Sequence, residues 1–385
     1  MMILDRPYVS QLLSHTLSND GIPAVKCGDI RIPLEKTLQV INLQEASQHI
    51  HNENIRILCN SEYAVSSIYP YLSGTEIINQ IDLFKNKAKF REILKKYYPK
   101  FFFRECTYEE IFQLKSDTLP YPLVIKPSKG FRSVGVYLVE RAEDWNSICR
   151  QLEQDMLAAK EIYPDTVVSA NSFILEEFIQ GEEYAIDAYF GQTGEPVILN
   201  VFKRMFAHEA DTSDRIYYTG KKVLMESLSK IESFMDSLGK EFALRNFPMH
   251  FEVRITQAGE LIPIEVNPLR FAGLCTTDLG AHAYGINVYE YYFQQRKPDW
   301  NRIIETMDDS IFSFLCAELP LSIDGRLIES VHDRKFEKNF TDLLEYRLIP
   351  YEEYPTFSVV FYRSNSLDEN QYLLDLDLEQ YLVMK

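Results

Sequence analysis

Two carboxylates and an amide lie on two short apolar runs that alternate like adjacent strands of one hairpin. The runs are residues 250–254, which carry Glu252, and residues 261–267, which carry Glu265 and Asn267. Because side chains alternate faces along a strand, Glu265 and Asn267 point the same way, and a paired strand can place Glu252 beside them. Hard oxygen donors of this kind suit Mg²⁺, which completes its coordination with water and phosphate oxygens. The spacing therefore predicts a magnesium site that serves a nucleotide.

A strand, a loop of small residues and a second strand are predicted over residues 121–139. Lys126 ends the first strand, and Gly130, Ser133 and Gly135 give the loop its conformational freedom. Such a loop can lay backbone N–H groups over phosphate oxygens, while Lys126 supplies a point charge. The chain has neither the Walker phosphate loop nor the dinucleotide fingerprint. We interpret the segment as a phosphate lid, and an ordinary glycine-containing hairpin is the alternative.

The segment 173–187 predicts an apolar strand, a turn at Gln180 and Gly181, and a second alternating strand. A purine could lie flat on Phe178 or Ile179 and bond edge-on to the connecting backbone. A carboxylate just after the turn could accept from ribose hydroxyls. The alternative for this segment is a solvated acidic edge strand.

In this order, the three segments resemble the ATP-grasp superfamily of carboxylate–amine ligases, over about residues 80–295. The D-alanine:D-alanine ligases and the amino-acid ligases form a branch with a shared spacing of metal ligands. In that branch an acid is followed thirteen positions later by a Glu, and two positions after that by an Asn, as in Glu252, Glu265 and Asn267. The resemblance implies an α/β protein with the ATP-grasp fold, in which two α+β lobes grip ATP. It also implies ATP and two Mg²⁺ ions as cofactors, with Mn²⁺ as a substitute. Glu252 and Glu265 would bridge the two ions, with Asn267 on one of them.

The resemblance further assigns the residues that contact the phosphates. Lys126 contacts the α and β phosphates, and a second lysine is expected on the preceding helix, where Lys87 is our choice and Lys85 the alternative. The lid has Phe-Arg where the D-alanine:D-alanine ligases have Gly-Ser. Arg132 therefore supplies charge in place of some backbone contacts, and Ser133 follows it in the lid.

For the adenosine, the resemblance implies contacts along one hinge. The backbone of Glu177 and Ile179 would bond to the adenine, with Phe178 between them. Glu176 would point toward the adenine amino group, and Glu183 would bind the ribose.

Three cations are candidates for the reacting groups. Arg270 follows the metal strand on a loop, and its planar fork can hold a carboxylate or acyl phosphate. Lys203 and Arg204 lie near the start of the aromatic-rich segment 201–220. This segment suits a mobile loop that closes over the reacting groups. His250 stands where the D-alanine:D-alanine branch has an arginine, and we interpret it as a neutral histidine of the core or strand face.

Four domains are predicted. They are a pre-ATP α/β domain of Rossmann-like type over residues 1–82, a first grasp lobe over 83–180, a second grasp lobe with the metal hairpin over 181–298, and a C-terminal α/β elaboration over 299–385, which either packs on the grasp or forms a dimer surface. Helices are expected from about Pro7 to Asn19, within 83–120, over 142–160, from Lys222 to Arg245, and from Thr276 to Gln295.

Composition limits the classes of partner. Lys and Arg total 40 against 57 Asp and Glu, a net charge of −17, which disfavours a nucleic-acid partner. No run approaches the roughly 20 apolar residues of a membrane span, so we expect no membrane contact and a cytoplasmic location. The six cysteines are scattered without metal-type spacing, which indicates free buried thiols. A homodimer is a candidate assembly.

The resemblance implies an ATP-dependent ligase. It would activate a carboxylate as an acyl phosphate and join it to an amine, giving an amino-acid amide or dipeptide-type product with release of ADP and phosphate. Its partners would be ATP and two small molecules, a carboxylate and an amine. Two alternatives stay open: a kinase-like or peptide-modifying ATP-grasp protein, and an ATP-binding module without catalysis.

Overall fold

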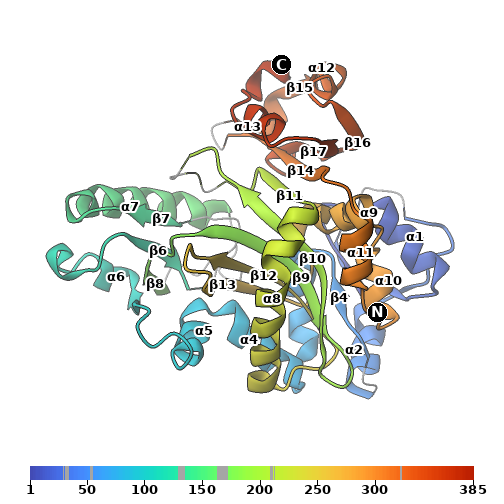
Figure 1. The fold of residues 1–385 in the computed structure, drawn as a ribbon, viewed down its shortest axis with the longest axis horizontal. Coiled ribbons are helices and arrows are strands. Elements are labelled where there is room, and N and C mark those ends of the chain that lie inside the picture. The colour runs from blue at the N-terminus through green and yellow to red at the C-terminus, as the bar shows by residue number, and fades with distance from the viewer. Residues whose placement is uncertain are drawn as a thin grey trace.

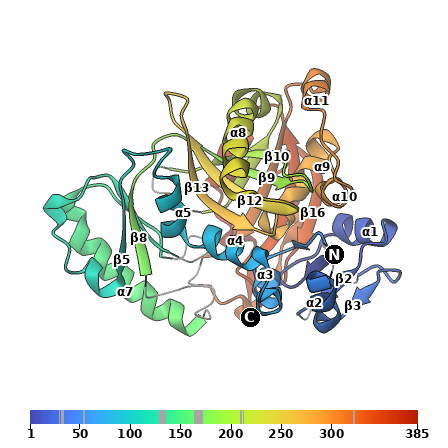
Figure 2. The same ribbon diagram turned by 90° about the horizontal axis from the view of Figure 1, so that it is seen from below.

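The computed structural model describes residues 1–28, 30, 34–52, 55–128, 135–162, 172–208, 211, 213–320 and 323–385. The chain forms an N-terminal domain, a small first lobe and a large central sheet, to which the C-terminal region is joined (Figures 1 and 2). The predicted lid residues Arg132 and Ser133 lie outside the described residues.

The N-terminal domain is a parallel sheet with the strand order β3-β2-β1-β4. Its strands are β1 (Met2–Leu4), β2 (Ala24–Lys26), β3 (Val40–Ile41) and β4 (Leu58–Cys59), and its helices are α1 (Gln11–Asn19), α2 (Leu43–Asn52) and α3 (Glu62–Ile68). The parallel sheet that the sequence predicts for this region is observed. Helix α1 begins four residues later than predicted because Ser10 caps it, with its hydroxyl accepting from the backbone N–H of Leu13 at 3.1 Å.

Two helices follow where the sequence indicated one. They are α4 (Glu76–Lys85) and α5 (Lys87–Leu94), and Asn86 separates them with an extended backbone. The Asn86 side chain accepts from Lys89 N–H at 3.0 Å and so caps α5. The break gives Lys85 and Lys87 different directions, because Lys85 ends one helix and Lys87 starts the next.

The first lobe is an antiparallel sheet with the order β5-β8-β6-β7. Its strands are β5 (Phe103–Thr107), β6 (Leu123–Pro127), β7 (Tyr137–Val139) and β8 (Ser172–Glu177), and its helices are α6 (Tyr108–Ile111) and α7 (Trp145–Ile162). Strands β6 and β7 pair on either side of the lid segment, as predicted. Trp145 and Leu152 of α7 pack on Ile125 and Phe173 of the sheet and give this lobe its own core.

The central sheet has eight strands in the order β13-β12-β9-β10-β11-β14-β17-β16, and its neighbours are antiparallel. The strands are β9 (Glu182–Phe190), β10 (Pro196–Met205), β11 (Ile216–Thr219), β12 (Phe247–Ile255), β13 (Leu261–Pro268), β14 (Ile311–Glu318), β16 (Asp342–Leu348) and β17 (Thr356–Ser364). Helix α8 (Lys221–Phe242) covers one face, and its buried residues include Leu224, Ile231 and Met235 (Figure 1). The hairpin predicted from strand alternation is β12 and β13.

The C-terminal region adds strands to this sheet instead of forming a separate layer. Tyr217 of β11 pairs with Phe314 of β14, so the sheet crosses the predicted boundary between residues 298 and 299. The remaining elements are α11 (Trp300–Thr306), β15 (Ile328–Val331), α12 (Asp333–Glu337), α13 (Asp368–Leu374) and β18 (Leu382–Met384). Of the two expectations for this region, packing on the grasp is therefore observed.

The segment after β13 is broken where one helix was predicted. It comprises the 3₁₀ stretch Gly273–Asp278, α9 (Leu279–Tyr284) and α10 (Val288–Phe293). Gly285 ends α9 in the left-handed region with φ of 75°, which a residue without a Cβ adopts at little cost. Tyr289, Tyr292 and Phe293 of α10 are buried in the core that this segment shares with the N-terminal domain.

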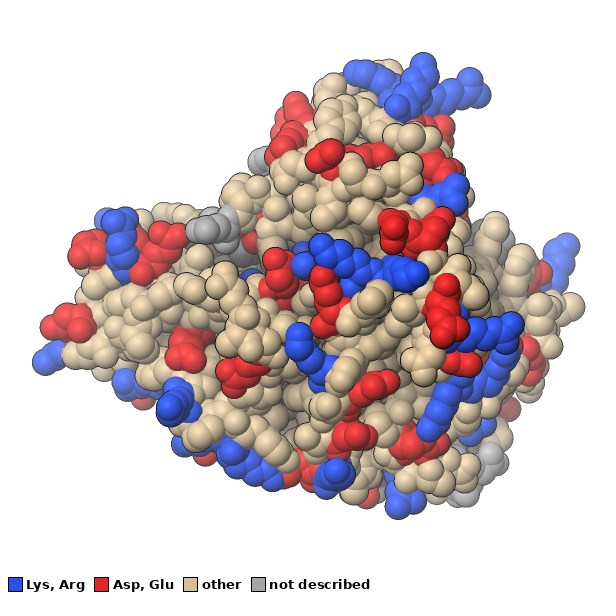
Figure 3. Space-filling view, viewed as in Figure 1, with Lys and Arg blue, Asp and Glu red and all other residues tan. Residues whose placement is uncertain are grey.

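The surface shown in Figure 3 carries acidic and basic side chains interspersed, with no wide area of one sign. No helix in the described part of the chain is long and apolar enough to span a membrane. All six cysteines are free, and five of them are buried, as predicted.

Candidate active site

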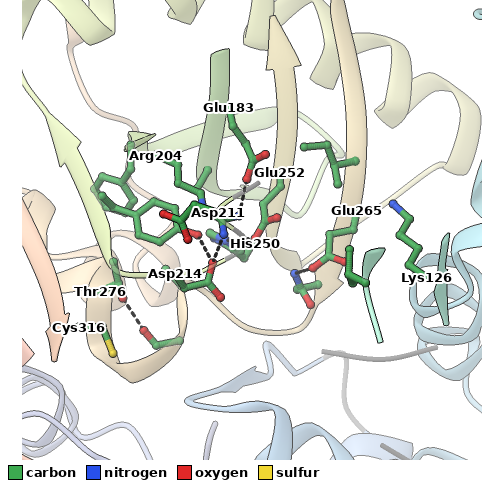
Figure 4. Close-up of a pocket in the computed structure, with 18 of the residues that line it drawn as sticks. Lys126, Glu183, Arg204, Asp211, Asp214, His250, Glu252, Glu265, Thr276 and Cys316 are labelled. Carbon is green, nitrogen blue, oxygen red and sulfur yellow. Dashed lines mark hydrogen bonds and ion pairs between the residues drawn. The ribbon is translucent and has the colours of Figure 1, made fainter. Parts of the chain in front are cut away.

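A cavity of about 500 Å³ lies where the N-terminal domain, the first lobe and the central sheet meet. Its walls include Glu62 of α3, Lys126 of β6, Glu183 of β9 and Phe314 of β14. In Figure 4, Lys126 lies at one side and Thr276 and Cys316 at the other, with Glu252 between them. One cavity thus collects most of the residues that the sequence singled out.

The two predicted metal carboxylates face each other across the hairpin. Glu252 of β12 pairs in register with Glu265 of β13, and a bulge at Ile264 follows, where the register shifts from Glu265 to Pro263. Asn267 donates from Nδ2 to Glu265 Oε1 at 3.1 Å. The predicted convergence of the three oxygen-bearing side chains is therefore observed, and all three line the cavity.

The charges around these acids favour a cation between them. Burial would raise the pKa of Glu265, but Lys87, whose Nζ lies 2.8 Å from Oε2, lowers it to about 2. Burial and the neighbouring Glu265 raise the pKa of Glu252. Two carboxylates and an amide fit Mg²⁺, which would relieve their repulsion. No group of three or more His, Cys, Asp or Glu suited to a metal occurs among the described residues.

His250 is buried on strand β12, in agreement with its interpretation as a core or strand-face histidine, but two carboxylates flank it. Its Nδ1 lies 2.8 Å from Asp187 Oδ1, and its Nε2 lies 3.7 Å from Glu252 Oε1. Burial alone would lower the pKa of His250, but the two carboxylates outweigh burial and raise it to about 9. The imidazolium thus places a positive charge beside the metal acids at neutral pH.

Asp187 was not singled out from the sequence, although it organises this region. Besides His250, it accepts from the Ala272 N–H at 2.8 Å and the Thr277 hydroxyl at 2.6 Å. Asn200 donates from Nδ2 to its second oxygen at 2.9 Å. Asp187 is fully buried, and it ties the metal strand to the loop that follows β13. The sequence feature that could have revealed Asp187 is an acidic residue at an inward-facing position of the otherwise apolar strand β9.

Lys126 and Glu176 form a buried ion pair between β6 and β8. Arg91 of α5 completes the group, with Nε 2.7 Å from Glu176 Oε2 and Nη1 donating to Pro263 O at 2.6 Å. Burial would raise the pKa of Glu176, but the two cations lower it to about 2. Both predicted residues line the cavity. Arg91, which sequence reasoning missed, links the first lobe to the metal hairpin.

The predicted adenine hinge connects the first lobe to the central sheet, because β8 and β9 belong to different sheets. Glu177 and Phe178 are anchored by backbone bonds to Phe102 O and Pro122 O, each at 3.0 Å. Residues 176–179 all line the cavity. The hinge therefore offers an apolar surface and an anchored backbone, and its contacts with an adenine stay a prediction.

Arg254 of β12 is a second cation that the sequence did not reveal. Its guanidinium lies 4.7 Å from the ring centre of Phe178 and donates to Ile179 O at 2.7 Å. It also pairs with Glu183 at 2.9 Å. Arg254 thus donates to the carbonyl of Ile179 and to one oxygen of Glu183. The second oxygen of Glu183 accepts from Arg204 Nη1 at 2.7 Å.

Arg204 and Lys203 lie on opposite faces of β10. Arg204 lines the cavity and is held by Glu183 and by the carbonyl of Ser213, which accepts from Nη2 at 2.7 Å. Lys203 pairs with Glu182 at 3.1 Å and is not among the lining residues of the described chain. Successive strand residues alternate faces, so only one of these two neighbours can point into the cavity.

Arg270 lines the cavity and pairs with Glu62 of α3. The Nε atom of Arg270 lies 3.1 Å from Oε2 of Glu62. Lys85 pairs with the other oxygen of Glu62. Lys87, in contrast, lines the cavity beside Glu265. The geometry therefore favours Lys87 over Lys85 as the lysine nearest to the candidate metal site.

Comparison with known families tests the resemblance drawn from the three motifs. Residues 119–278 match the family described as the ATP-grasp domain. The chain contains an ATP-grasp domain. The match spans the lid, the hinge and the metal hairpin, and it confirms the resemblance. No curated protein matches this chain in sequence.

Solved structures show a similar fold over the whole chain. An L-amino acid ligase from Bacillus licheniformis superposes with a TM-score of 0.68 at 15% identity, covering 100% of this chain and 98% of that one. An N5-carboxyaminoimidazole synthase from Aspergillus clavatus, in complex with ADP and 5-aminoimidazole ribonucleotide, gives 0.63 at 12% identity and covers 97% and 96%. The biotin carboxylase domain of the Hydrogenobacter thermophilus 2-oxoglutarate carboxylase, in complex with MgADP and bicarbonate, gives 0.61 at 12% identity and covers 100% and 90%. At these identities the likeness shows the fold, so the predicted ATP-grasp fold is confirmed.

Proposed function

We propose that this protein is an ATP-dependent carboxylate–amine ligase that activates a carboxylate as an acyl phosphate and joins it to an amino-acid amine. The observation that carries the proposal is the facing pair Glu252 and Glu265, with Asn267 beside them and Lys87 and Lys126 on the same cavity. An acidic metal site next to buried lysines suits a triphosphate and its magnesium. The likeness to an L-amino acid ligase supports amino acids as the substrate class.

The adenosine would occupy the hinge. Phe178 and Ile179 offer the apolar surface, and Glu176 and the backbone of Glu177, which also line the cavity, would lie along the purine edge. Glu183 would bind the ribose while it holds Arg204 and Arg254 in place. Lys126 and Lys87 would contact the phosphates, and Arg132 and Ser133 of the lid would cover them.

Glu252, Glu265 and Asn267 would hold Mg²⁺, as two ions in the proposed arrangement, with Mn²⁺ as a substitute. When bound, the metal would neutralise phosphate charge and polarise the γ-phosphoryl group. Lys87 lies within ion-pair distance of Glu265, so its charge would contact both that carboxylate and a phosphate bound beside it.

The reaction would proceed in two steps. A carboxylate oxygen attacks the γ-phosphorus, the bond to ADP breaks, and an acyl phosphate forms. The amine nitrogen then attacks the carbonyl carbon, and phosphate leaves with the former carboxylate oxygen. Arg204 and Arg270, which both line the cavity, would orient the two charged substrates. No nucleophilic side chain is needed, so the protein has to position the substrates and exclude water.

The test is phosphate release from Mg-ATP in the presence of pooled amino acids and small carboxylates, with products identified by mass. An amide of two pool members would support the ligase. A phosphorylated product without an amide would support the kinase-like alternative. Intact binding of Mg-ATP with no phosphate release in any pool would favour a peptide or unusual carboxylate, or the module without catalysis. The expected homodimer and cytoplasmic location stay predictions.

A further inference from the structure

The loop between β13 and α9 has an uncommon backbone. Leu269, Leu274 and Cys275 all have positive φ values, of 59°, 51° and 59°. Residues with a Cβ seldom adopt this left-handed region, and they keep it only where surrounding contacts hold them there. Leu274, Gly273 and Thr276 line the cavity, so the contacts that hold this loop also shape the wall of the cavity.

The start of the loop and residue 277 are held by the central sheet and by β4 of the N-terminal domain. Asp187 accepts from the Ala272 N–H and from the Thr277 hydroxyl. The carbonyl of Leu269 accepts from the Cys59 N–H at 2.7 Å. These contacts fix residues that flank Leu274 and Cys275, and the far end of the loop is held by the C-terminal region.

That far end is Asp278, whose partner comes from β16, the edge strand of the sheet. Arg347 Nη1 lies 2.9 Å from Asp278 Oδ2, and the two residues are 5% and 1% exposed. The two atoms are close but not aligned for a hydrogen bond, so the contact is an attraction of charges. The Tyr289 hydroxyl donates to the other oxygen of Asp278 at 2.9 Å.

Arg347 is itself held firmly. Its Nε and Nη2 lie 2.6 and 2.8 Å from the two oxygens of Glu345, two residues before it on the same face of β16. His282 of α9 pairs with Glu345 at 3.0 Å. The guanidinium lies 4.5 Å from the ring centre of Phe361, and Phe361 packs edge-on against Phe314, which lines the cavity.

We propose that Arg347 is a positioning residue that, through Asp278, holds the loop Gly273–Asp278 in the conformation that receives the substrate which reacts with ATP. The proposal rests on the proposed function and gives the C-terminal region a role in it. In Figure 4, Thr276 lies across the metal acids from Lys126. Loss of the contact therefore loosens the substrate side of the cavity and leaves the nucleotide side unchanged.

The test compares Arg347→Met with Arg363→Met in the full chain. Arg363 lies on the neighbouring strand β17 and pairs with Asp342 at 2.7 Å, but both side chains of that pair are more than 40% exposed, which makes it a matched control. Hydrogen exchange is measured with Mg-ADP present. We expect peptides covering residues 269–284 to exchange at least about tenfold faster in Arg347→Met only. Peptides covering residues 173–190 should not change.

The kinetic readout separates positioning from general damage. An equimolar mixture of the twenty proteinogenic amino acids is the probe, and phosphate release is followed. For Arg347→Met, the half-saturating concentration of the mixture should rise about tenfold or more, while that of ATP stays within about twofold. Arg347→Lys, which keeps the charge but loses the planar fork, should lie between wild type and Arg347→Met.

Unchanged exchange of the loop, or equal increases for ATP and the mixture, would overturn the proposal. If Arg347→Met does not fold, Arg347→Met with Asp278→Asn removes both buried charges and is compared in the same way. If the mixture releases no phosphate with wild type, the proposed substrate class fails, and the exchange of the loop alone decides whether Arg347 holds it.

Discussion

Glu252 stands directly opposite Glu265 in the β12–β13 hairpin, and the pKa values of the two carboxylates are shifted in opposite directions. Lys87 stabilises the charge of Glu265, while burial and Glu265 itself disfavour the charge of Glu252. A divalent cation bound between two carboxylates this close would offset their mutual repulsion.

Glu265→Gln should lower Mg-dependent phosphate release about 100-fold or more, because several kcal/mol of metal-assisted stabilisation of the phosphoryl group is lost. The control is Glu260→Gln, an exposed acid in the turn of the same hairpin. Phosphate release is measured at saturating Mg²⁺, with circular dichroism as the check on folding. A folded Glu265→Gln protein with wild-type turnover would show that the acid does not serve the metal.

Lys87→Met should raise the half-saturating concentration of ATP about tenfold or more, since a charge-assisted contact to phosphate is worth about 1.5–3 kcal/mol. Lys89→Met, an exposed lysine on the same helix, should behave as wild type. Lys85→Met should change ATP affinity less than Lys87→Met, because Lys85 pairs with Glu62. A larger effect at Lys85 than at Lys87 would reverse the assignment of the nucleotide lysine.

Glu176 should make folding stability depend on acid pH. Its pKa falls from 4.5 to about 2 on folding, so its contribution is present above about pH 4.5 and is lost as the pH falls toward 2. Glu176→Gln leaves Lys126 and Arg91 buried without their carboxylate and should cost about 3–5 kcal/mol at pH 7.

Urea unfolding at pH 7 and pH 3.5 measures this effect. The gap in unfolding free energy between wild type and Glu176→Gln should narrow at the lower pH, while the exposed control Glu140→Gln should show no such gap. A gap that is constant across this range would mean that the pKa of Glu176 is not lowered.

Asp187→Asn should destabilise the fold by about 3–5 kcal/mol, because an amide cannot accept from all four donors that the buried carboxylate satisfies. Asp236→Asn, at an exposed position of α8, is the matched control. Urea unfolding at neutral pH measures both variants. Equal stability of the two would mean that Asp187 is not the centre of the network.

The metal hairpin could be predicted from sequence because alternation of side chains along a strand is a local property. Glu265 and Asn267 are two residues apart, and the short turn fixed their partner. The hinge was predictable for the same reason, since residues 173–187 contain the strand, the turn and the next strand.

Contacts between distant segments could not be predicted in this way. His250 was interpreted as neutral because its partner Asp187 lies 63 positions away, and no local pattern pairs them. The join of β14 to β11 and the contact of Arg347 with Asp278 likewise depend on how the chain returns to the sheet. The sequence alone does not distinguish Lys203 from Arg204 as the cation of the cavity. The register of β10 in the sheet determines which of the two faces it.

The broken helices had local causes that the apolar pattern did not weigh. Asn86 caps a new helix inside a run that could continue as one, and Gly285 ends α9. Capping and left-handed residues override periodicity at these points.

The central claim is that ATP activates a carboxylate as an acyl phosphate, and transfer of an oxygen isotope tests it most directly. Amino acids labelled with ¹⁸O in the carboxyl group are incubated with Mg-ATP and the protein, and the released phosphate is examined by mass spectrometry. The account predicts one ¹⁸O atom in each phosphate formed together with an amide product. Amide formation with unlabelled phosphate would contradict it, because the carboxylate oxygen would then never have been bonded to phosphorus.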